Sequence, residues 1–209
     1  MNKIWFTADS HFGHKNIIKY CDRPYDSVEE MDRDLIENWN DLVGPDDEVY
    51  HLGDFSLDFK IASQVLPLLN GQKHLIAGNH DLCHSSNGGS AYIRRYLEAG
   101  FATVKEETSL TILGQIVRLC HLPYFDPDDI DSRLPEYKPD DDGSWLLHGH
   151  VHLRWQQNQK QINVGVDVWD YAPVSLKQIE QVLSNAENNE FSGRHRRFHA
   201  GINPQLMTY

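Results

Sequence analysis

Five short polar patches stand where apolar segments of this 209-residue chain end, and they constrain the fold more than any other feature. They combine histidine, aspartate and asparagine, and they are Asp9-Ser10-His11, Gly53-Asp54, Gly78-Asn79-His80-Asp81, His121 and Gly149-His150-Val151-His152. Four follow directly on a segment that reads as a β-strand, and the fifth lies where another strand ends. Open α/β sheets gather ligands beyond the carboxyl ends of their strands. We therefore expect the patches to meet in one cleft.

The order of the predicted elements supports this expectation. Strands are predicted at 4–8, 48–52, 73–77, 101–106, 110–120 (with a hairpin turn at Gly114-Gln115), 145–147 and 161–164. Helices are predicted at 28–42, 59–70 (where Pro67 leaves the end open), 91–99 and from a Ser175 cap onward. Strands alternate with helices first and with other strands later. This rhythm predicts a mixed α/β domain with sheet layers inside and helices outside.

Length and composition predict one soluble domain over residues 1–185, followed by a polar, basic tail over 186–209. No apolar run approaches the roughly 20 residues that a membrane span needs, and the N-terminus lacks the features of a signal peptide. Three widely spaced cysteines form no CxxC pair. This usage indicates a reducing compartment, so a cytoplasmic location is expected.

The net charge limits the class of partner. A formal charge of −12 argues against binding to an extended nucleic-acid duplex, because such affinity comes mostly from Lys and Arg on phosphates. Two bound divalent ions would raise the total only to about −8. The expected partner is a small phosphorylated substrate, a nucleotide above all, or a nucleic-acid end. The sequence does not fix the oligomeric state.

The residue types in the patches indicate a metal site. Mixed imidazole and oxygen ligands favour Mn, Fe, Zn or Ni over Ca or Mg. Two M²⁺ ions with Asp9 and Asp54 leave a local charge of about +2, or about +1 with a bridging hydroxide, which suits an anionic phosphoryl group. Two ions about 3.5–4 Å apart also lower the pKa of a bound water towards ~7. We therefore predict hydrolysis of a phosphate ester at two divalent ions, whose identity the residue types leave open. Mn²⁺ is the first choice among Mn, Fe, Zn and Ni.

The ordered set resembles the calcineurin-like metallophosphoesterase superfamily, whose pattern runs D-x-H, G-D, G-N-H-D/E, H, G-H-x-H. The resemblance extends from Asp9 to His152, and residues 9–17 are similar to small stand-alone members from bacteria and phages. It implies an α/β fold with a two-layered β-sandwich flanked by helices in four layers, α/β/β/α. The superfamily often has G-D-x-x-D, but here Leu57 stands in that place and Asp58 falls one later, which leaves the ligand Asp54 unaffected.

The resemblance also implies residue roles. One ion would be held by Asp9, His11, Asp54 and His152, and the other by Asp54, Asn79, His121 and His150, so that Asp54 bridges them. His80 would act as general acid or phosphate contact, oriented by Asp81, while a metal-activated hydroxide attacks phosphorus.

Several residues beside the patches are candidates for a supporting or substrate-binding role. His14, Asn16 and Arg133 are candidate contacts to substrate phosphate. His51 and His148 fit the core or a place behind the ligands, and Asp167 could orient a ligand histidine or be an ordinary strand-end carboxylate. The acidic loop 122–144, with Tyr124, Phe125 and Tyr137, is either a lid over the substrate or a solvated loop. The basic tail is interpreted as an ordinary chain terminus.

Three functions remain open from the sequence. The first is a phosphoesterase acting on a small ester, as a nucleotide-type phosphodiester or a monoester. The second is a noncatalytic binding scaffold on the same fold, which usually lacks the histidine that is present here as His80. The third is a nuclease acting on nucleic-acid ends, against which the short chain and the acidic charge argue.

Overall fold

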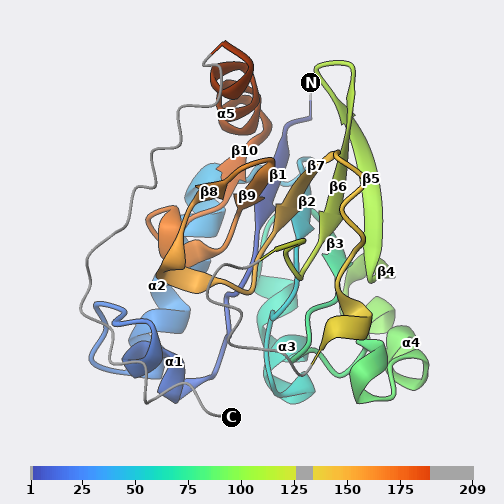
Figure 1. The fold of residues 1–209 in the computed structure, drawn as a ribbon. Helices are drawn as coiled ribbons and strands as arrows, with labels where there is room; N and C mark the ends of the chain where they lie inside the picture. Colours follow the sequence, from blue (N-terminus) through green and yellow to red (C-terminus); the bar gives the residue numbers. More distant parts are fainter. Residues whose placement is uncertain (1, 126–133, 189–209) are drawn as a thin grey trace.

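Two five-stranded sheets form the centre of the molecule, a computed structural model that describes residues 2–125 and 134–188 (Figure 1). The first sheet has the order β10 (Val174–Ser175), β1 (Ile4–Thr7), β2 (Glu48–His51), β3 (Gln72–Ile76) and β4 (Phe101–Lys105). The second has the order β5 (Glu107–Ile112), β6 (Gln115–Cys120), β7 (Trp145–His148), β9 (Gln161–Asn163) and β8 (Gln157–Asn158). Strands β1 to β4 are parallel, as are β6, β7 and β9. The edge strands β10, β5 and β8 run antiparallel to their neighbours.

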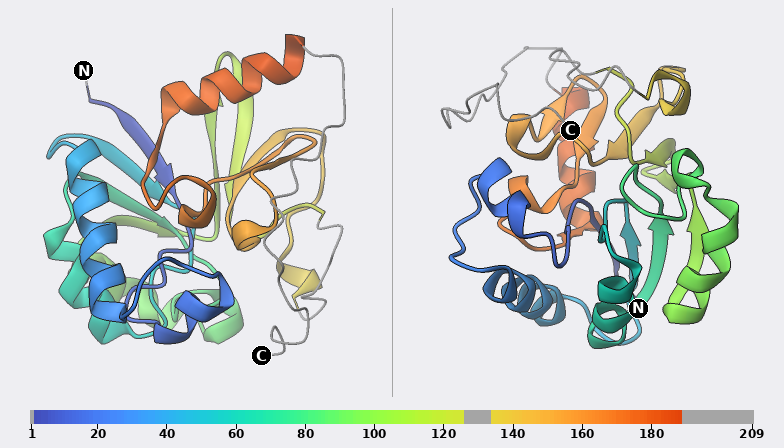
Figure 2. Two further views of the ribbon diagram at one scale, coloured as in Figure 1. Left: turned by 90° about the vertical axis from the view of Figure 1, so that its left-hand side faces the viewer. Right: turned by 90° about the horizontal axis from the view of Figure 1, so that it is seen from below.

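Among the described residues, five α-helices flank these sheets: α1 (Lys15–Tyr20), α2 (Val28–Leu42), α3 (Phe59–Val65), α4 (Ser90–Ala99) and α5 (Leu176–Asn188). Short 3-10 turns in the same part of the chain join the elements, at Leu66–Leu68, Ser85–Asn87, Pro135–Tyr137, His152–Arg154 and Val166–Val168. Helix α2 covers one face of the first sheet, and the second sheet lies on the other side (Figure 2). Helix α5 packs against β1 and β10.

The alternation of side chains along the strands makes two cores. Trp5, Val49 and Leu75 point to the helices, where they join a cluster that includes Met31, Leu35 and Trp39 of α2. Their neighbours Phe6 and Ile76 point the other way and pack with Val117, Leu119 and Leu147 of the second sheet. Because successive strand residues face opposite sides, a central sheet buried on both faces needs continuous apolar strands. Each fully buried side chain of this size contributes about 1.5–3 kcal/mol.

The predicted fold class, a mixed α/β sandwich with flanking helices, is confirmed. The prediction of one helix over 59–70 was wrong in its second half, because Pro67 turns the chain into a 3-10 segment after Val65. Helix α1 and the two-residue strands β8 and β10 were not among the predicted elements. The Ser175 cap is present: its Oγ accepts the Gln178 N–H at 3.3 Å, and Gln178 Oε1 accepts the Ser175 N–H at 2.9 Å.

The structure describes only part of the predicted C-terminal tail, residues 186–209. Helix α5 runs to Asn188, so it includes the first residues of the predicted tail, while 189–209 lie outside the described residues. Within the part of the chain that the structure describes, no helix combines the length and the apolarity that crossing a bilayer requires.

Candidate metal centre

The loops that follow β1, β2 and β3 leave the first sheet side by side. Thr7 pairs with His51, and His51 with Leu75, so the three strands end at one level. Backbone hydrogen bonds continue beyond the strands, from Asp9 N–H to the Gly53 carbonyl and from His11 N–H to the Asp54 carbonyl, both at 3.0 Å. The loop after β7 joins the loop after β6 through the Gly149 N–H and the His121 carbonyl, at 3.1 Å. The predicted cleft at the carboxyl ends of the strands therefore has a backbone framework.

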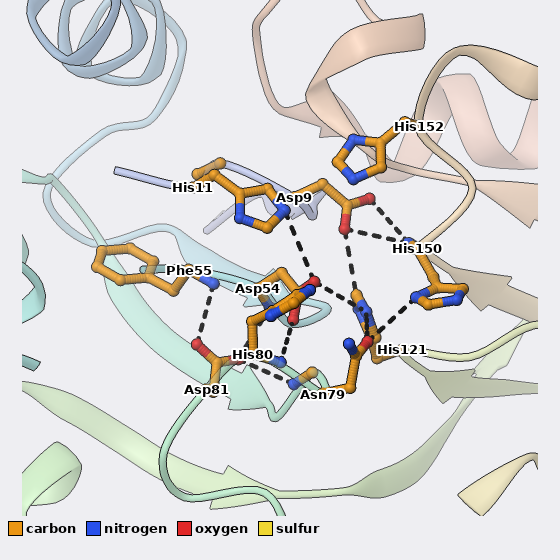
Figure 3. Close-up of polar contacts among 12 residues, drawn as sticks. Asp9, His11, Asp54, Phe55, Asn79, His80, Asp81, His121, His150 and His152 are labelled. Carbon is orange, nitrogen blue, oxygen red and sulfur yellow. Dashed lines mark hydrogen bonds and ion pairs between the residues drawn. The ribbon is translucent and has the colours of Figure 1, made fainter. Parts of the chain in front are cut away.

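Five of the seven predicted ligands have left-handed backbone conformations. Their φ angles are 56° at Asp9, 51° at His11, 57° at Asp54, 71° at His150 and 47° at His152. Such values are uncommon outside glycine, although Asp and His adopt them more readily than most residues. Each strained residue costs on the order of 1–3 kcal/mol, and such residues cluster at functional sites. The sharp turns direct side chains from separate loops into one space (Figure 3).

Two glycines allow the loops to approach this closely. Gly53 has φ +88°, and a Cβ there would lie 2.6 Å from His121 Nδ1. A Cβ at Gly149 would lie 2.7 Å from Asp9 Oδ2. Real Cβ atoms do not come this near to other heavy atoms, so any larger residue would displace a predicted ligand. The backbone at Gly53 and at Gly149 therefore approaches the predicted ligands closely.

The side chains of the first predicted ligand set come together beyond the carboxyl end of β1. This set consists of Asp9, His11, Asp54 and His152. One ligand atom from each of Asp9, His11 and His152 lies within 4.8 Å of the others. The His11 and His152 rings stack at 5.3 Å between centroids, and His11 Nε2 lies 3.6 Å from Asp54 Oδ2. These four side chains surround a common space in Figure 3.

The second predicted set, Asp54, Asn79, His121 and His150, makes direct contacts. Asn79 Oδ1 lies 3.1 Å from both His121 Nε2 and His150 Nδ1, and His121 Nε2 lies 3.3 Å from Asp54 Oδ2. His121 Nδ1 is 2.8 Å from the Leu52 carbonyl, which can only accept, so the ring proton sits on Nδ1. In a neutral ring Nε2 then carries a lone pair that faces the Asn79 and Asp54 oxygens. Three such atoms stay together only with a proton or a cation among them.

The electrostatics of the site fit bound cations. Burial raises the pKa of Asp9, and the nearby Asp54 carboxylate adds to this. Burial also opposes ionisation of Asp54, but the imidazoles of His121, His80 and His11 hold its pKa well below its usual range. The His121 ring is buried as well, yet Asp54 and Asp9 raise its pKa to about 9. A proton on the His121 ring thus offsets the negative charge of Asp54 and Asp9, as a metal ion in the same space would.

The ring nitrogens of His11 also show whether the site suits a bound metal ion. Both of its ring nitrogens are buried, and neither has a hydrogen-bond partner among the described residues. Burial lowers the pKa of this ring well below its ordinary value, so it is a neutral imidazole with a free lone pair. A buried polar atom without a partner costs about 1–3 kcal/mol. Coordination of a divalent ion would satisfy it.

Arg23, which lies behind the first ligand set, was not among the residues predicted for the site. Its guanidinium makes a fully buried ion pair with Asp167, with Nε at 2.8 Å from Oδ1. The same group donates to the carbonyls of Asp9 at 2.7 Å and Ser10 at 3.0 Å. Asp167 Oδ2 in turn contacts His152 Nδ1 at 2.7 Å, which leaves Nε2 to face the site. Arg23 and Asp167 therefore join the loop of Asp9 and His11 to the loop of His152.

His80 lies at the edge of the ligand sets, whereas Asp81 differs from its expected role of orienting the His80 ring. The His80 ring is exposed and lies 5.7 Å from the His11 ring, and its backbone N–H donates to Asp54 Oδ1 at 2.9 Å. Among the described residues no contact joins the Asp81 carboxylate to that ring. Asp81 instead accepts the backbone N–H groups of Asp54, Phe55 and Gly78, at 2.8–3.0 Å. It is placed to hold the loops after β2 and β3 together rather than to orient His80.

Of the candidate substrate contacts that the structure describes, His14 lies beside the predicted ligands and Asn16 does not. His14 is half-buried, with its ring 5.5 Å from that of His11. Asn16 lies exposed on α1, and no described contact brings it to the ligands. Arg133 lies outside the described residues. Described residues of the loop 122–144 pack against the second sheet, in a cluster of Leu122, Tyr124, Leu134 and Tyr137 with Cys120 and Leu146. Phe125 of the same loop is 55% exposed.

His51 and His148, the two strand histidines next to the patches, support the site from the core. His51 is buried and its Nε2 lies 2.9 Å from the Ser10 hydroxyl, which supports the loop between Asp9 and His11. His148 is buried against Trp155, with 4.6 Å between the rings.

The surroundings of the Asp32 carboxylate predict how the thermal stability of the protein depends on pH. Both of its oxygens accept the Gly13 N–H at 3.0 Å, which ties the loop after His11 to α2. Burial raises its pKa from 3.8 to about 6, although the Gly13 bond opposes this. The ionised carboxylate therefore costs stability above pH 6, and protonation relieves that cost as the pH falls towards 4. We expect Asp32→Asn to raise Tm at pH 7.5 and to lose this advantage near pH 4.

The measurement is thermal unfolding of both proteins between pH 4 and pH 8. Asp34→Asn, at a more exposed carboxylate of the same helix, is the matched control for loss of a negative charge. A Tm difference between Asp32→Asn and the wild type that does not change with pH would contradict the prediction.

The comparisons with known proteins agree with the fold and the patches. Residues 3–169 match the model of the calcineurin-like phosphoesterase superfamily domain. An uncharacterized protein from Methanocaldococcus jannaschii is 37% identical over 197 residues, covering 90% of this chain and 94% of its own. The gene 66 protein of Mycobacterium phage L5 is 32% identical over 209 residues, covering 91% and 98%. A solved protein of unknown function from Aquifex aeolicus has a TM-score of 0.66 at 26% identity, covering 87% and 100%.

The chain therefore belongs to the calcineurin-like phosphoesterase superfamily. The resemblance inferred from the five patches is confirmed. The carboxylate and histidine groups at the strand ends could hold a metal.

Proposed function

We propose that the protein hydrolyses a phosphate ester, a nucleotide-type phosphodiester, at two divalent metal ions, with Mn²⁺ the first choice. One observation carries the proposal: Asp54 Oδ2 faces one imidazole from each ligand set, His11 Nε2 at 3.6 Å and His121 Nε2 at 3.3 Å. An oxygen in this position is suited to lie between two cations. The three free, buried cysteines fit the cytoplasmic location proposed with this function.

The chain offers a complete donor set for each ion. Asp9, His11, Asp54 and His152 would hold one, and Asp54, Asn79, His121 and His150 the other. When bound, such a pair stabilises the attacking and leaving oxygens of an in-line displacement and lowers the pKa of water. Mixed nitrogen and oxygen donors favour Mn, Fe, Zn or Ni over Mg.

His80 supplies the proton that the leaving group needs. Its N–H bond to Asp54 fixes the backbone at the edge of the ligand sets, and its exposed ring lies 5.7 Å from the His11 ring. A diester releases an alkoxide, so a ring nitrogen that donates a proton to that oxygen lowers the barrier. His14, beside His11, is placed to contact a nonbridging phosphate oxygen.

The test begins with protein stripped by EDTA and reloaded separately with Mn²⁺, Fe²⁺, Ni²⁺, Zn²⁺ or Mg²⁺. Each form is assayed on bis-p-nitrophenyl phosphate, p-nitrophenyl phosphate, cyclic nucleotides and mononucleotides. We expect hydrolysis of diesters that depends on the metal and is fastest with Mn²⁺. Absence of hydrolysis across this panel would overturn the proposal and favour the noncatalytic scaffold.

His80→Asn separates catalysis from metal binding. We expect kcat on a cyclic nucleotide, which releases an alkoxide, to fall by about 10²–10⁴-fold, the usual contribution of a general acid. Metal content by mass spectrometry should stay that of the wild type, because His80 is in neither ligand set. An unchanged kcat would remove His80 from the reaction.

A further inference from the structure

A cavity of about 470 Å³ lies between the beginning of α3 and the first turns of α4, outside the ligand sets. We call it the α3–α4 pocket and define it by Asp58, Phe59, Lys60, Leu82, Tyr92 and Arg95 of its lining. Helices α3 and α4 contact each other, and both lie in the lower part of the molecule in Figure 1. The volume is within the usual range of small-molecule sites, about 300–1,000 Å³.

The pocket carries two cationic side chains without a carboxylate partner among the described residues. The Arg95 guanidinium lies over two aromatic rings, with its Cζ 4.4 Å from the Phe59 centroid and 5.6 Å from that of Tyr92. Stacking holds the face of the guanidinium and leaves its N–H edge for an anion. Lys60 projects from the first turn of α3 and is exposed. Asp58 is the one acidic member of the lining, so the pocket keeps a net positive charge.

This arrangement differs from the neighbouring surface of the same helix. Arg94 lies next to Arg95 in sequence, but its Nε pairs with Glu98 Oε1 at 2.7 Å on the solvent side of α4. Arg95 could have been neutralised in the same way and is not. In a chain of charge −12, two uncompensated cations around one cavity indicate an anionic ligand.

The pocket is tied to the candidate catalytic loop. Leu82 follows His80 by two residues, so their Cα atoms are at most about 7 Å apart. The Leu82 N–H donates to the Tyr96 hydroxyl of α4 at 3.2 Å, and the Tyr96 ring packs against Phe59 at 5.1 Å. The wall that carries Arg95 is therefore fixed relative to the loop that carries His80.

We propose that the α3–α4 pocket binds a second phosphoryl group of the substrate. The preferred substrate is then a phosphodiester that carries a further phosphate, such as an oligonucleotide end with a terminal phosphate. The diester lies at the ligand sets, and the remote phosphate meets the edge of Arg95 and the Lys60 ammonium. This inference rests on the proposed hydrolysis of phosphodiesters and names its substrate class.

The experiment compares thymidine dinucleotides with a terminal 5′-phosphate, with a terminal 3′-phosphate and with neither. For the metal-loaded wild type we expect one phosphorylated form to have a kcat/KM about tenfold to a hundredfold above the unphosphorylated form, the range for hydrogen bonds to charged groups. In the variant Lys60→Gln/Arg95→Gln this ratio should fall to about 1. The matched control Arg94→Gln should keep the wild-type ratio. A ratio near 1 in the wild type, or one that the double variant preserves, overturns the inference.

A binding measurement separates this inference from the proposed function. Calorimetry on EDTA-treated protein measures the dinucleotides without any contribution from metals. Tighter binding of a phosphorylated form to the wild type, lost in the double variant, supports the pocket even if no diester is hydrolysed. Equal binding of all three dinucleotides overturns the pocket even if bis-p-nitrophenyl phosphate is cleaved.

Discussion

Asp54→Asn is expected to reduce metal-dependent hydrolysis of bis-p-nitrophenyl phosphate by on the order of 10³-fold or more. The Asp54 side chain is buried, and its Oδ2 faces His11 and His121. Asparagine retains an oxygen that can accept the His80 N–H, so the loop should keep its conformation. It lacks the negative charge that would compensate both cations. We therefore expect metal content to fall below that of the wild type together with kcat/KM.

The measurements are kcat/KM with excess Mn²⁺ and metal content by mass spectrometry after dialysis. Asp46→Asn, at an exposed carboxylate in the turn before β2, is the control and should match the wild type in both. Circular dichroism shows whether the Asp54 variant is folded. A folded variant with wild-type activity and metal content would show that Asp54 is no ligand.

The positions of the predicted ligands could be anticipated because local signals placed them. Short segments such as 4–7 and 48–51 form strands with buried positions, and a polar residue just after each strand must lie at the end of the sheet. The spacing of Asp9 and His11 then brings both to one side of the turn. These features depend on a few neighbouring residues. The same is true of the Ser175 cap and of α2, whose buried face follows a helical period.

The remaining features depend on contacts that no local pattern encodes. Arg23 meets Asp167 across 144 positions of sequence, so neither residue signals the pair alone. The Asp81 carboxylate binds backbone N–H groups, which are identical at every position and leave no trace in side-chain types. The left-handed turns at the ligands occur at Asp and His rather than at glycine, the residue that normally indicates them. Tertiary contacts, not propensity, stabilise these turns.

Arg23→Met is expected to destabilise the protein by about 3–5 kcal/mol, because it leaves Asp167 buried without its charge partner. For a chain of this size that corresponds to a loss of roughly 10 °C in Tm. Burial alone would raise the pKa of Asp167, but Arg23 and the contact with His152 hold it well below its usual range, so the carboxylate stays ionised. Thermal unfolding measures the loss. Arg33→Met, at an exposed ion pair, should change stability by no more than about 1 kcal/mol.

The double variant Arg23→Met/Asp167→Leu separates support of the fold from positioning of a metal ligand. Replacing a whole buried ion pair by apolar side chains is often neutral, so much of the lost stability should return. His152 Nδ1, however, would lose the acceptor that lies 2.7 Å away and orients its ring. Loss of such an outer partner typically weakens metal affinity by 10–100-fold. Recovery of Tm with weaker Mn²⁺ binding by calorimetry is therefore the expected result. Wild-type affinity in this variant would show that the Arg23–Asp167 pair serves the fold alone.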